Sequence, residues 1–288
     1  MTTLRTLLLT ALAMFAFAAN SVLCRLALHK ASIDPASFAS VRLVSGALVL
    51  ALLLRRKTGA AAHSPSPVSA GPDWIAATML WVYVTCFSFA YLSLAAGTGA
   101  LILFGAVQLT MFSVGMASGE RFAPMAWAGL ALSVAGFVHL VSPGIEAPAP
   151  WGAALMALAG IAWGVYSLRG RKVGDPLAAT ANNFLRASPL ALAMSVVLAS
   201  SMQASASGIA LAIASGAITS GLGYVVWYAA LRGLTSLRAA AVQLSVPPIA
   251  AIGGALLLAE TITTRLWLDS LAILGGITLV LMARAHRP

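Results

Sequence analysis

Charged residues are scarce in this sequence. They make up 8% of the 288 residues, against about 25% in an average soluble domain, while 60% are hydrophobic and the mean hydropathy is +0.95. A surface with so few charges is not solvated by water over most of its area, which excludes a soluble globular fold. We therefore expect an all-α membrane protein whose first partner is the lipid bilayer.

Residues that bind metals or form disulfides are also few. The two cysteines, Cys24 and Cys86, lie in apolar runs without the spacing of a zinc site or a disulfide framework. There is no H-E-x-x-H motif and no pair of aspartates within an apolar run. The histidines fall in expected loops or near span ends: His29, His63, His139 and His286. We therefore expect no metal, no cofactor and no enzyme activity; a membrane-embedded enzyme is the weaker alternative.

Positive charge exceeds negative charge, with a formal net charge of +10. A nucleic-acid-binding protein gathers its lysines and arginines in one patch or on one helix face. Here they stand in small groups between apolar runs. This spacing argues against nucleic acid as a partner and is typical of loops at a membrane surface.

Ten apolar runs are candidates for membrane spans. Crossing a hydrocarbon core about 30 Å thick takes roughly 20 apolar residues, so a chain of this length holds about ten spans joined by short loops. The most polar connector, 55–73, is rich in proline and serine and predicts an exposed loop. The expected spans are 4–24, 36–54, 74–95, 98–118, 124–142, 151–168, 177–200, 208–231, 236–259 and 266–283.

Lysines and arginines fall mainly on one side of these spans. With the N-terminus placed inside, twelve of the 17 lie on the inner side, three lie on the outer side, and Arg42 and Arg186 lie within spans. Cytoplasmic loops are enriched in these residues. The count predicts a multi-pass protein of the plasma (inner) membrane with both termini in the cytoplasm.

The first apolar run has a second interpretation. Arg5, followed by apolar residues and then Ala16-Phe17-Ala18, has the layout of a cleavable signal peptide. However, the apolar stretch continues to Cys24, and its removal would break the repeat described next. We therefore interpret it as the first transmembrane span.

The two halves of the chain are related in sequence. Arg25 and Arg169, which close the first and sixth expected spans, are 144 residues apart. Arg42 and Arg186, within the second and seventh spans, are separated by the same interval of 144 residues. A shared offset across two spans predicts an internal duplication.

Five spans fall in each half. The first five-helix repeat is expected over 1–142 and the second over 151–288. Because five is odd, the second repeat enters the membrane inverted relative to the first. Inverted repeats around a central cavity are the usual construction of secondary transporters, with the binding site where the halves meet.

Four segments carry a pattern that extends over nearly the whole chain. They are residues 15–25 (FAFAANSVLCR), Arg42 with Gly46, Gly119-Glu120-Arg121, and residues 244–260 with Pro247-Pro248. These motifs resemble those of EamA-type transporters of the drug/metabolite transporter superfamily, which are ten-helix exporters. The resemblance implies a central cavity that is lined by both halves and opens alternately to either side of the membrane.

One departure from that pattern points to a branch of the family. Gln108 stands where the family usually has proline, and Trp163 lies in the sixth span. Together these residues most resemble the YddG-type exporters, which export aromatic and other neutral amino acids. The resemblance therefore implies an amino-acid substrate.

Polar and aromatic side chains inside the spans are the candidate substrate-binding residues, because ligand pockets combine apolar walls with a few polar groups. In the eighth span, residues from Ser220 to Tyr228 repeat at the spacing of one helix face. The alternatives are interfacial anchoring for the aromatic rings and interhelical hydrogen bonding for the amides. The candidates are Trp163, Tyr166, Gln108, Gln243, Tyr83, Ser88, Tyr224, Trp227, Tyr228 and Asn20.

Two arginines and no acids are expected deep inside the spans. Arg42 and Arg186 either extend to the membrane surface along their alkyl stems or form an anion site in the cavity. The seven acids fall in loops or at span ends, so proton coupling has no evident carrier at the midplane. We expect facilitated export down the solute gradient, or coupling through Glu120 or Glu260.

Two prolines are expected within the ninth span. Pro247-Pro248 would remove two backbone donors in mid-helix and free the carbonyls of the preceding turn. These carbonyls either accept from a substrate ammonium or merely accompany a kink that shapes the bundle.

Together these features predict a secondary transporter that exports small metabolites, specifically aromatic or other neutral amino acids, by alternating access. The alternative is a carrier of organic anions or nucleotide sugars, which needs more cavity cations than Arg42 and Arg186. A monomer is sufficient for this mechanism, and an oligomer stays open.

Overall fold

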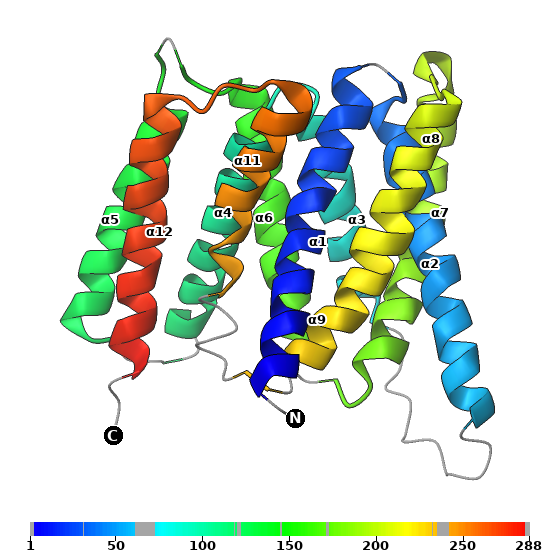
Figure 1. The fold of residues 1–288 in the computed structure, drawn as a ribbon, viewed down its shortest axis with the longest axis horizontal. Helices are drawn as coiled ribbons and strands as arrows, with labels where there is room; N and C mark the ends of the chain where they lie inside the picture. Colours follow the sequence, from blue (N-terminus) through cyan, green and yellow to red (C-terminus); the bar gives the residue numbers. More distant parts are fainter. Residues whose placement is uncertain are drawn as a thin grey trace.

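The computed structural model describes residues 3–30, 32–60, 73–117, 119, 122–144, 146–170, 173–231, 233–234 and 242–285. These residues form ten helical rods that stand side by side (Figure 1). The rods are α1 (Thr3–His29), α2 (Pro35–Ala60), α3 (Trp74–Ala90), α4 (Ala96–Ala117), α5 (Pro124–Val141), α6 (Pro150–Gly170), α7 (Pro176–Val197), the broken rod of α8 (Ala206–Ile213), η2 (Ala214–Leu222) and α9 (Gly223–Leu231), then α11 (Val246–Leu258) and α12 (Thr264–Ala285). A short 3-10 helix, η1 (Ala199–Ser201), precedes α8.

The bundle has two ends, which we call the near face and the far face. The near face is the end at which α1 begins and α12 ends, at the bottom of Figure 1; the far face is the opposite end. The first helix of each half runs in the opposite direction to its counterpart, since α1 begins at the near face and α6 ends there. This is the inversion expected from five spans per half.

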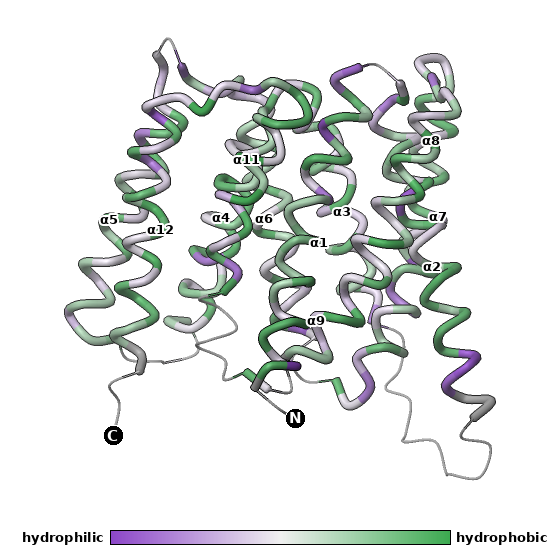
Figure 2. The backbone as a smooth tube through the Cα atoms, in the orientation of Figure 1, coloured by the Kyte–Doolittle hydropathy of each residue, from purple (hydrophilic) through white to green (hydrophobic). Residues whose placement is uncertain are grey.

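The helices have the length and surface of membrane spans. Seven of the described helices are long and apolar enough to cross a bilayer, and α3 and α11 are shorter apolar helices. Large apolar side chains lie outward, with Leu256 78% and Val197 80% exposed, as is expected where lipid replaces water. Hydrophobic residues fill the middle of the rods, whereas the near end of α2 is hydrophilic (Figure 2). The chain is a multi-pass all-α membrane protein, as predicted.

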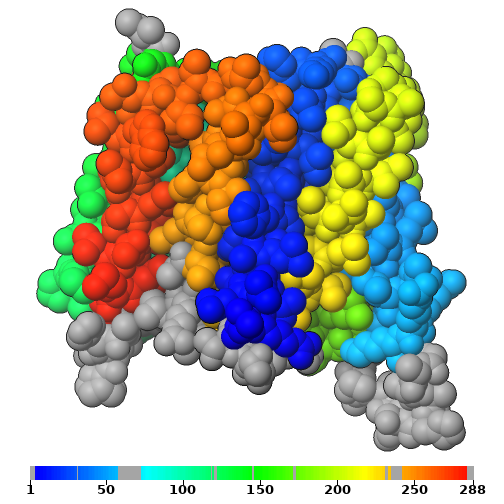
Figure 3. All heavy atoms as spheres, in the orientation of Figure 1, coloured from blue at the N-terminus to red at the C-terminus, as the bar shows by residue number. Residues whose placement is uncertain are grey.

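Contacts between helices follow a two-fold pattern. Three helices pack against their own counterparts: α5 against α12, α2 against α7, and α4 against α11. Several other contacts come in exchanged pairs, because α3–α6 is matched by α9–α1, α4–α6 by α11–α1, and α3–α7 by η2–α2. On the side seen in Figure 3, α1 lies between α11 and the α8–η2–α9 rod. The ten helices are therefore arranged as two inverted five-helix units.

Glycines allow the closest of these helix contacts. A Cβ atom on Gly276 of α12 would lie 2.4 Å from the carbonyl oxygen of Gly129 in α5, and one on Gly129 would lie 2.5 Å from that of Gly276. The backbones of the two helices are therefore in direct contact. Small residues take this role between membrane helices, where packing replaces the hydrophobic effect.

The expectation of two prolines in mid-helix is wrong. The ninth span was expected to begin at residue 236, but α11 begins at Val246, so that Pro247 and Pro248 lie in its first turn. The N–H groups of a first turn have no intrahelical partner, so proline is tolerated there and frees no carbonyls in mid-helix. Residues 235–241 lie outside the described part of the chain.

The eighth span contains a π-helix that the sequence pattern did not predict. The expected helix 208–231 is divided into α8, the nine-residue π-helix η2 and α9. A π-helix changes the facing of the residues on either side of it, and such segments are frequent at functional sites. In this molecule it directs Ser215, Thr219 and Ser220 toward α1 and α2.

Candidate substrate site

A buried arginine lies between the two halves. Arg42 of α2 is 1% exposed, and its Nε donates a hydrogen bond to Ser220 Oγ at 3.2 Å. Its Nη2 donates to the Tyr83 hydroxyl at 3.1 Å. The guanidinium lies 4.9 Å from the ring centre of Phe87 and 5.3 Å from that of Tyr83. Extension to the membrane surface is therefore the wrong interpretation for Arg42.

The partners of Arg42 are neutral. No ion pair joins it to a carboxylate of any described residue. Its Nη1 is buried and makes no hydrogen bond to the described residues. A buried charge with neutral partners is costly, because hydroxyls and aromatic rings recover only part of the hydration that it loses.

The π-helix η2 fixes the position of Arg42. A Cβ atom on Gly216 would lie 2.1 Å from the carbonyl oxygen of Arg42, so the two backbones are in contact. On the same segment, the hydroxyls of Ser215 and Thr219 both donate to Asn20 Oδ1 of α1. Asn20 therefore joins α1 to η2, which in turn holds Arg42.

Aromatic rings from both halves meet beside Arg42. We define the aromatic cluster as Tyr83, Phe87, Trp163, Tyr166 and Tyr224. The ring centre of Trp163 lies 4.9 Å from that of Tyr83, 5.3 Å from that of Tyr224 and 5.5 Å from that of Tyr166. Such pairs are favourable in offset and edge arrangements. The cluster gives the interior an apolar wall next to one cation.

A cavity leads from the near face to this cluster. It has a volume of about 240 Å³ between α2, α7 and α9, with the buried ring of Tyr224 in its wall. Lys57 and Asp175 also line it and form an ion pair of 2.7 Å. Their ends of α2 and α7 are at the near face, so the cavity approaches the cluster from that side.

Two sets of contacts join helices and loops at the far face. Arg25 forms an ion pair of 2.9 Å with Glu260, and the two side chains are 12% and 14% exposed. Arg25 also donates to the carbonyls of Tyr91 at 2.9 Å and Leu92 at 3.1 Å, while the N–H of Ala96 donates to Glu260 at 2.8 Å. This ion pair joins α1, α3, α4 and the end of α11.

The second set joins two loops. Ile33, between α1 and α2, forms an isolated β-bridge with Ala204, between η1 and α8. The N–H of Ser205 donates to the carbonyl of Ser32, and the N–H of Asp34 to that of Gln203, both at 2.7 Å. The far side of α1 and α2 is therefore held to the α8–η2–α9 rod.

Most of the sequence-predicted site residues lie in or near the cluster. Tyr83, Trp163, Tyr166 and Tyr224 belong to it. Trp227 contacts Phe17, whose ring in turn lies 6.1 Å from that of Tyr224. Two further candidates border the same region, since Tyr228 lines the near-face cavity and Asn20 lies behind η2.

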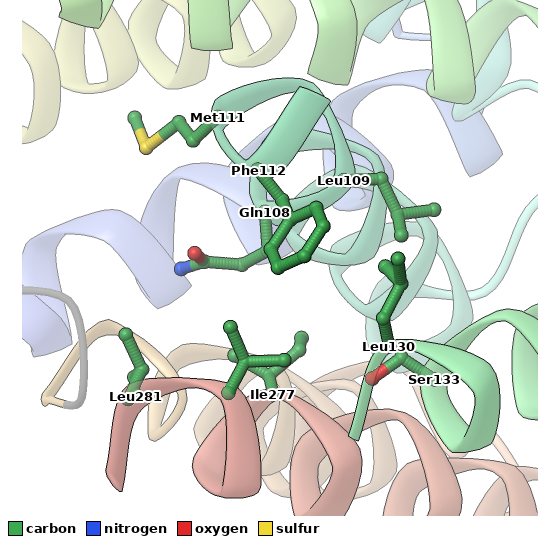
Figure 4. Close-up of a pocket in the computed structure, with 9 residues that line it drawn as sticks. Gln108, Leu109, Met111, Phe112, Leu130, Ser133, Ile277 and Leu281 are labelled. Atoms are coloured by element: carbon green, nitrogen blue, oxygen red, sulfur yellow. The ribbon is translucent and has the colours of Figure 1, made fainter. Parts of the chain in front are cut away.

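Of the other three predicted residues, Gln108 lies in a different pocket and Ser88 is used locally. Gln108 lines a separate small pocket between α4, α5 and α12, where it extends toward Ile277 and Leu281 (Figure 4). Gln243 is half-buried in the segment before α11. The buried Ser88 donates to the carbonyl of Val84 within its own helix.

One acid at a span end is buried. Asp269 lies in the second turn of α12 and is 2% exposed. Its carboxylate lies 2.7 Å from Nδ1 of His139 on α5. Arg265 donates to the carbonyls of His139 and Ser142. These polar contacts join α5 to α12 on the far side and are separate from the aromatic cluster; Glu120 lies outside the described residues.

The near face carries an exposed ion pair at the start of α3. Arg169 of α6 lies 2.8 Å from Asp73, which also accepts a hydrogen bond from the N–H of Ala76. The Arg169 guanidinium holds the pKa of Asp73 below its ordinary value, and the helix-capping bond adds to this shift. The two side chains are 41% and 34% exposed, so water screens the pair.

Comparisons with known proteins agree with this fold. The profile of the EamA-like transporter family matches residues 150–282, which span α6 to α12. A Pseudomonas aeruginosa (strain PAO1) protein described as uncharacterized protein PA1977 is 50% identical over 283 residues, covering 98% of this chain and 96% of that protein. A solved crystal structure of a protein superposes with a TM-score of 0.65 at 20% identity, over 96% of this chain and 98% of the other, which shows a shared fold.

Proposed function

We propose that this chain, which belongs to the EamA-like transporter family, exports small metabolites, specifically aromatic or other neutral amino acids, by alternating access. The family consists of membrane transporters of small molecules. The substrate, the direction of transport and the assignment of the near face to the cytoplasm are our proposals.

The observation that carries the proposal is the aromatic cluster between the two halves. Tyr83 comes from α3, Trp163 from α6 and Tyr224 from α9, and the rings are in mutual contact through Trp163. An interior pocket with aromatic walls and few polar groups suits a small, partly apolar solute. The ammonium of an amino acid would be stabilised on the ring faces.

Alternating access is supported by the difference between the two ends. The far face is held together by Arg25–Glu260 and by the bridge between Ile33 and Ala204, whereas the cavity beside Tyr224 approaches from the near face. The mirrored helix contacts support the proposed repeats, 1–142 and 151–288. A scaffold with this symmetry reaches the opposite state by exchanging the arrangements of its halves.

The proposed orientation rests on charge. The near-face ends of α2 and α6 carry Arg55, Arg56, Lys57 and Arg169. Cytoplasmic ends of spans are enriched in such residues, so we place the near face in the cytoplasm and the chain in the inner membrane. Substrate would then enter from the cytoplasm, as export requires.

We propose facilitated export without proton coupling. Among the described residues, no carboxylate forms an ion pair with Arg42. Glu260 is the alternative carrier, because its protonation would weaken its ion pair with Arg25 and loosen the far face. Lumenal pH in proteoliposomes that changes in proportion to the solute moved would contradict the uncoupled version.

A carrier of organic anions is the second candidate function, and Arg42 is the observation that favours it. Nucleotide sugars are less well supported, since they carry two phosphate charges. The second interior arginine, Arg186, lies 6.0 Å from the ring centre of Trp74 at the start of α3, away from Arg42.

Counterflow in proteoliposomes tests these alternatives directly. Vesicles are loaded with one unlabelled solute, and uptake of the same solute in labelled form is measured. The solutes tested in turn are neutral amino acids, monocarboxylates and nucleotide sugars. We expect accumulation of aromatic amino acids by the wild type and its loss in Trp163→Ala. Trp151→Ala is the matched control, because Trp151 is 76% exposed at the far end of α6. Counterflow of nucleotide sugars but not amino acids would reject the proposal.

A further inference from the structure

We propose that Arg42 is the binding point for a single carboxylate of the transported solute, which makes a carboxylate obligatory and an amine dispensable. The inference rests on the proposed transport function and narrows its substrate class. It predicts that, among solutes with the same aromatic ring, those with a carboxylate bind and those without one do not.

The first argument is the geometry of the guanidinium. Nε and Nη2 are held by Ser220 and Tyr83, which fix the plane of the group, while Nη1 is buried and has no hydrogen-bond partner among the described residues. An arginine presents N–H donors in a planar fork that matches a carboxylate. Two protein contacts orient the group and leave one nitrogen for a ligand.

The second argument is charge. Arg42 is 1% exposed and has no carboxylate partner among the described residues. An ionised group inside a membrane protein ordinarily pairs with an opposite charge or marks a substrate pathway. A ligand carboxylate supplies the missing charge, and it gains more from this contact than it would at a hydrated surface.

The third argument is the surroundings of the binding point. Tyr83 and Phe87 lie against the guanidinium, and Trp163 lies beside Tyr83. The apolar part of a bound solute would therefore pack on the aromatic cluster while its carboxylate reaches Nη1. Tyr224 lines the near-face cavity and contacts Trp163, so it connects that cavity to the rest of the cluster.

The charge balance also sets an upper limit. One cation neutralises one carboxylate, and the nearest cation along the cavity, Lys57, is already paired with Asp175 and 55% exposed. A second anionic group on the ligand would stay uncompensated in the apolar cluster. Dicarboxylates and phosphorylated solutes are therefore expected to bind more weakly than monocarboxylates.

Three ligands with one phenyl ring separate the possibilities. Binding of L-phenylalanine, 3-phenylpropionate and phenylalanine amide is measured on the full-length protein in detergent by isothermal titration calorimetry. We expect the two carboxylates to bind within about tenfold of each other, and the amide roughly 30-fold or more weakly. In Arg42→Gln the affinity for both carboxylates should fall by the same roughly 30-fold factor. In Arg42→Lys, which keeps the charge but not the planar fork of donors, the affinity should fall by part of that factor. Arg186→Gln should match the wild type.

A second measurement does not depend on aromatic solutes. Acetate, compared with chloride at equal ionic strength, should raise the unfolding temperature of the wild type and of Arg186→Gln by roughly 2 to 4 °C, and leave Arg42→Gln unchanged. This outcome supports the carboxylate point even if phenylalanine counterflow fails, in which case only the amino-acid proposal is lost.

Two results would overturn the inference. One is phenylalanine amide that binds the wild type as tightly as phenylalanine. The other is acetate that stabilises Arg42→Gln as much as the wild type. If Arg42→Gln does not fold, Arg42→Lys decides, because equal carboxylate affinity in that variant contradicts recognition by the guanidinium fork.

Discussion

Equivalent arginines of the two halves lie in different surroundings. Arg42 of α2 is 1% exposed and contacts Tyr83, Phe87 and Ser220. Arg186, the corresponding residue of α7, is half-buried, and its guanidinium lies 6.0 Å from the ring centre of Trp74. Trp74 begins α3 at the near face, where an arginine reaches the membrane surface.

The arginines that close the first helix of each half differ in the same way. Arg25 and its partner Glu260 are 12% and 14% exposed, whereas Arg169 and its partner Asp73 are 41% and 34% exposed. In both comparisons the arginine of the first half is more deeply buried than that of the second half. The two halves therefore share a backbone arrangement but differ in where their arginines lie.

This difference shows which part of an inverted repeat is shared. The main helix contacts are symmetric, so we propose that the duplication supplies the scaffold and the two states of alternating access. The charges are not symmetric, which fits our proposal that the site recognises one carboxylate, at Arg42. Four comparisons between matched residues test this division.

The largest effect is expected from the interior arginines. In Arg42→Met, transport of aromatic amino acids should fall roughly 100-fold, while the unfolding temperature without substrate stays within about 3 °C of the wild type or rises, because a buried charge without a counter-ion is removed. Arg186→Met should transport within about twofold of the wild type. Proteoliposome uptake and differential scanning fluorimetry measure the two quantities. Equal losses of transport in both variants would break the comparison.

The next effect concerns the two ion pairs. Glu260→Gln removes the charge opposite Arg25 and should lower the free energy of unfolding by about 2 to 3 kcal/mol, since the pair is largely withdrawn from water. Asp73→Asn should cost about 1 kcal/mol or less, because its pair with Arg169 is exposed. Denaturant unfolding in one detergent compares them. A larger loss in Asp73→Asn would reverse the argument.

A smaller effect is expected from the backbone contact that positions Arg42. A Cβ atom on Gly216 would lie 2.1 Å from the carbonyl oxygen of Arg42, whereas none of the described atoms would meet one on Gly275 within 4 Å. Gly216→Ala should therefore cost about 1 to 3 kcal/mol of stability and weaken carboxylate binding. Gly275→Ala, the control, should be neutral or slightly stabilising because alanine favours helix. Unchanged binding in Gly216→Ala would show that Arg42 does not depend on η2.

The smallest effect is the pH dependence of the near-face pair. The pKa of Asp73 is lowered from 3.8, so its stabilising contribution is complete above that value and is lost as the pH falls through the lowered pKa. The unfolding temperature of the wild type should therefore exceed that of Asp73→Asn at about pH 5, and the difference should shrink toward pH 3. A difference that grows on acidification would contradict the assigned ion pair.

Much of the scaffold was predictable from the sequence. Apolar runs and their polar connectors located the ten helices, and the spacing of Arg25 and Arg169 indicated the duplication. Hydropathy is averaged over a whole segment, so the location of a span does not depend on the environment of any single residue. The start of α11 was missed because Pro247 is compatible both with a kink in mid-helix and with a first turn. The π-helix η2 was missed because the hydropathy of the eighth apolar run is the same whether it forms an α-helix or a π-helix.

The site was predictable only in part. Four of the aromatic residues that were singled out within spans form the aromatic cluster with Phe87, and their role in substrate binding stays a prediction. Whether a mid-span arginine turns inward was not predictable, since Arg42 and Arg186 occupy equivalent places in their apolar runs. The deciding contacts of Arg42 come from Tyr83 and Ser220, which are 41 and 178 residues away.

The same separation bears on how the protein is made. The α2 segment enters the bilayer early in synthesis, and an arginine near the centre of a span costs about 2.5 to 3.5 kcal/mol on insertion scales. Ser220 follows Arg42 by 178 residues, which at roughly 5 to 20 residues per second takes about 10 to 40 seconds. Until then Arg42 has only its neighbours in α1 and α3 and whatever lipid headgroups or water it reaches. Arg42, which we propose as the carboxylate-binding residue, therefore has to be accommodated in the bilayer without Ser220 through most of the synthesis of the chain.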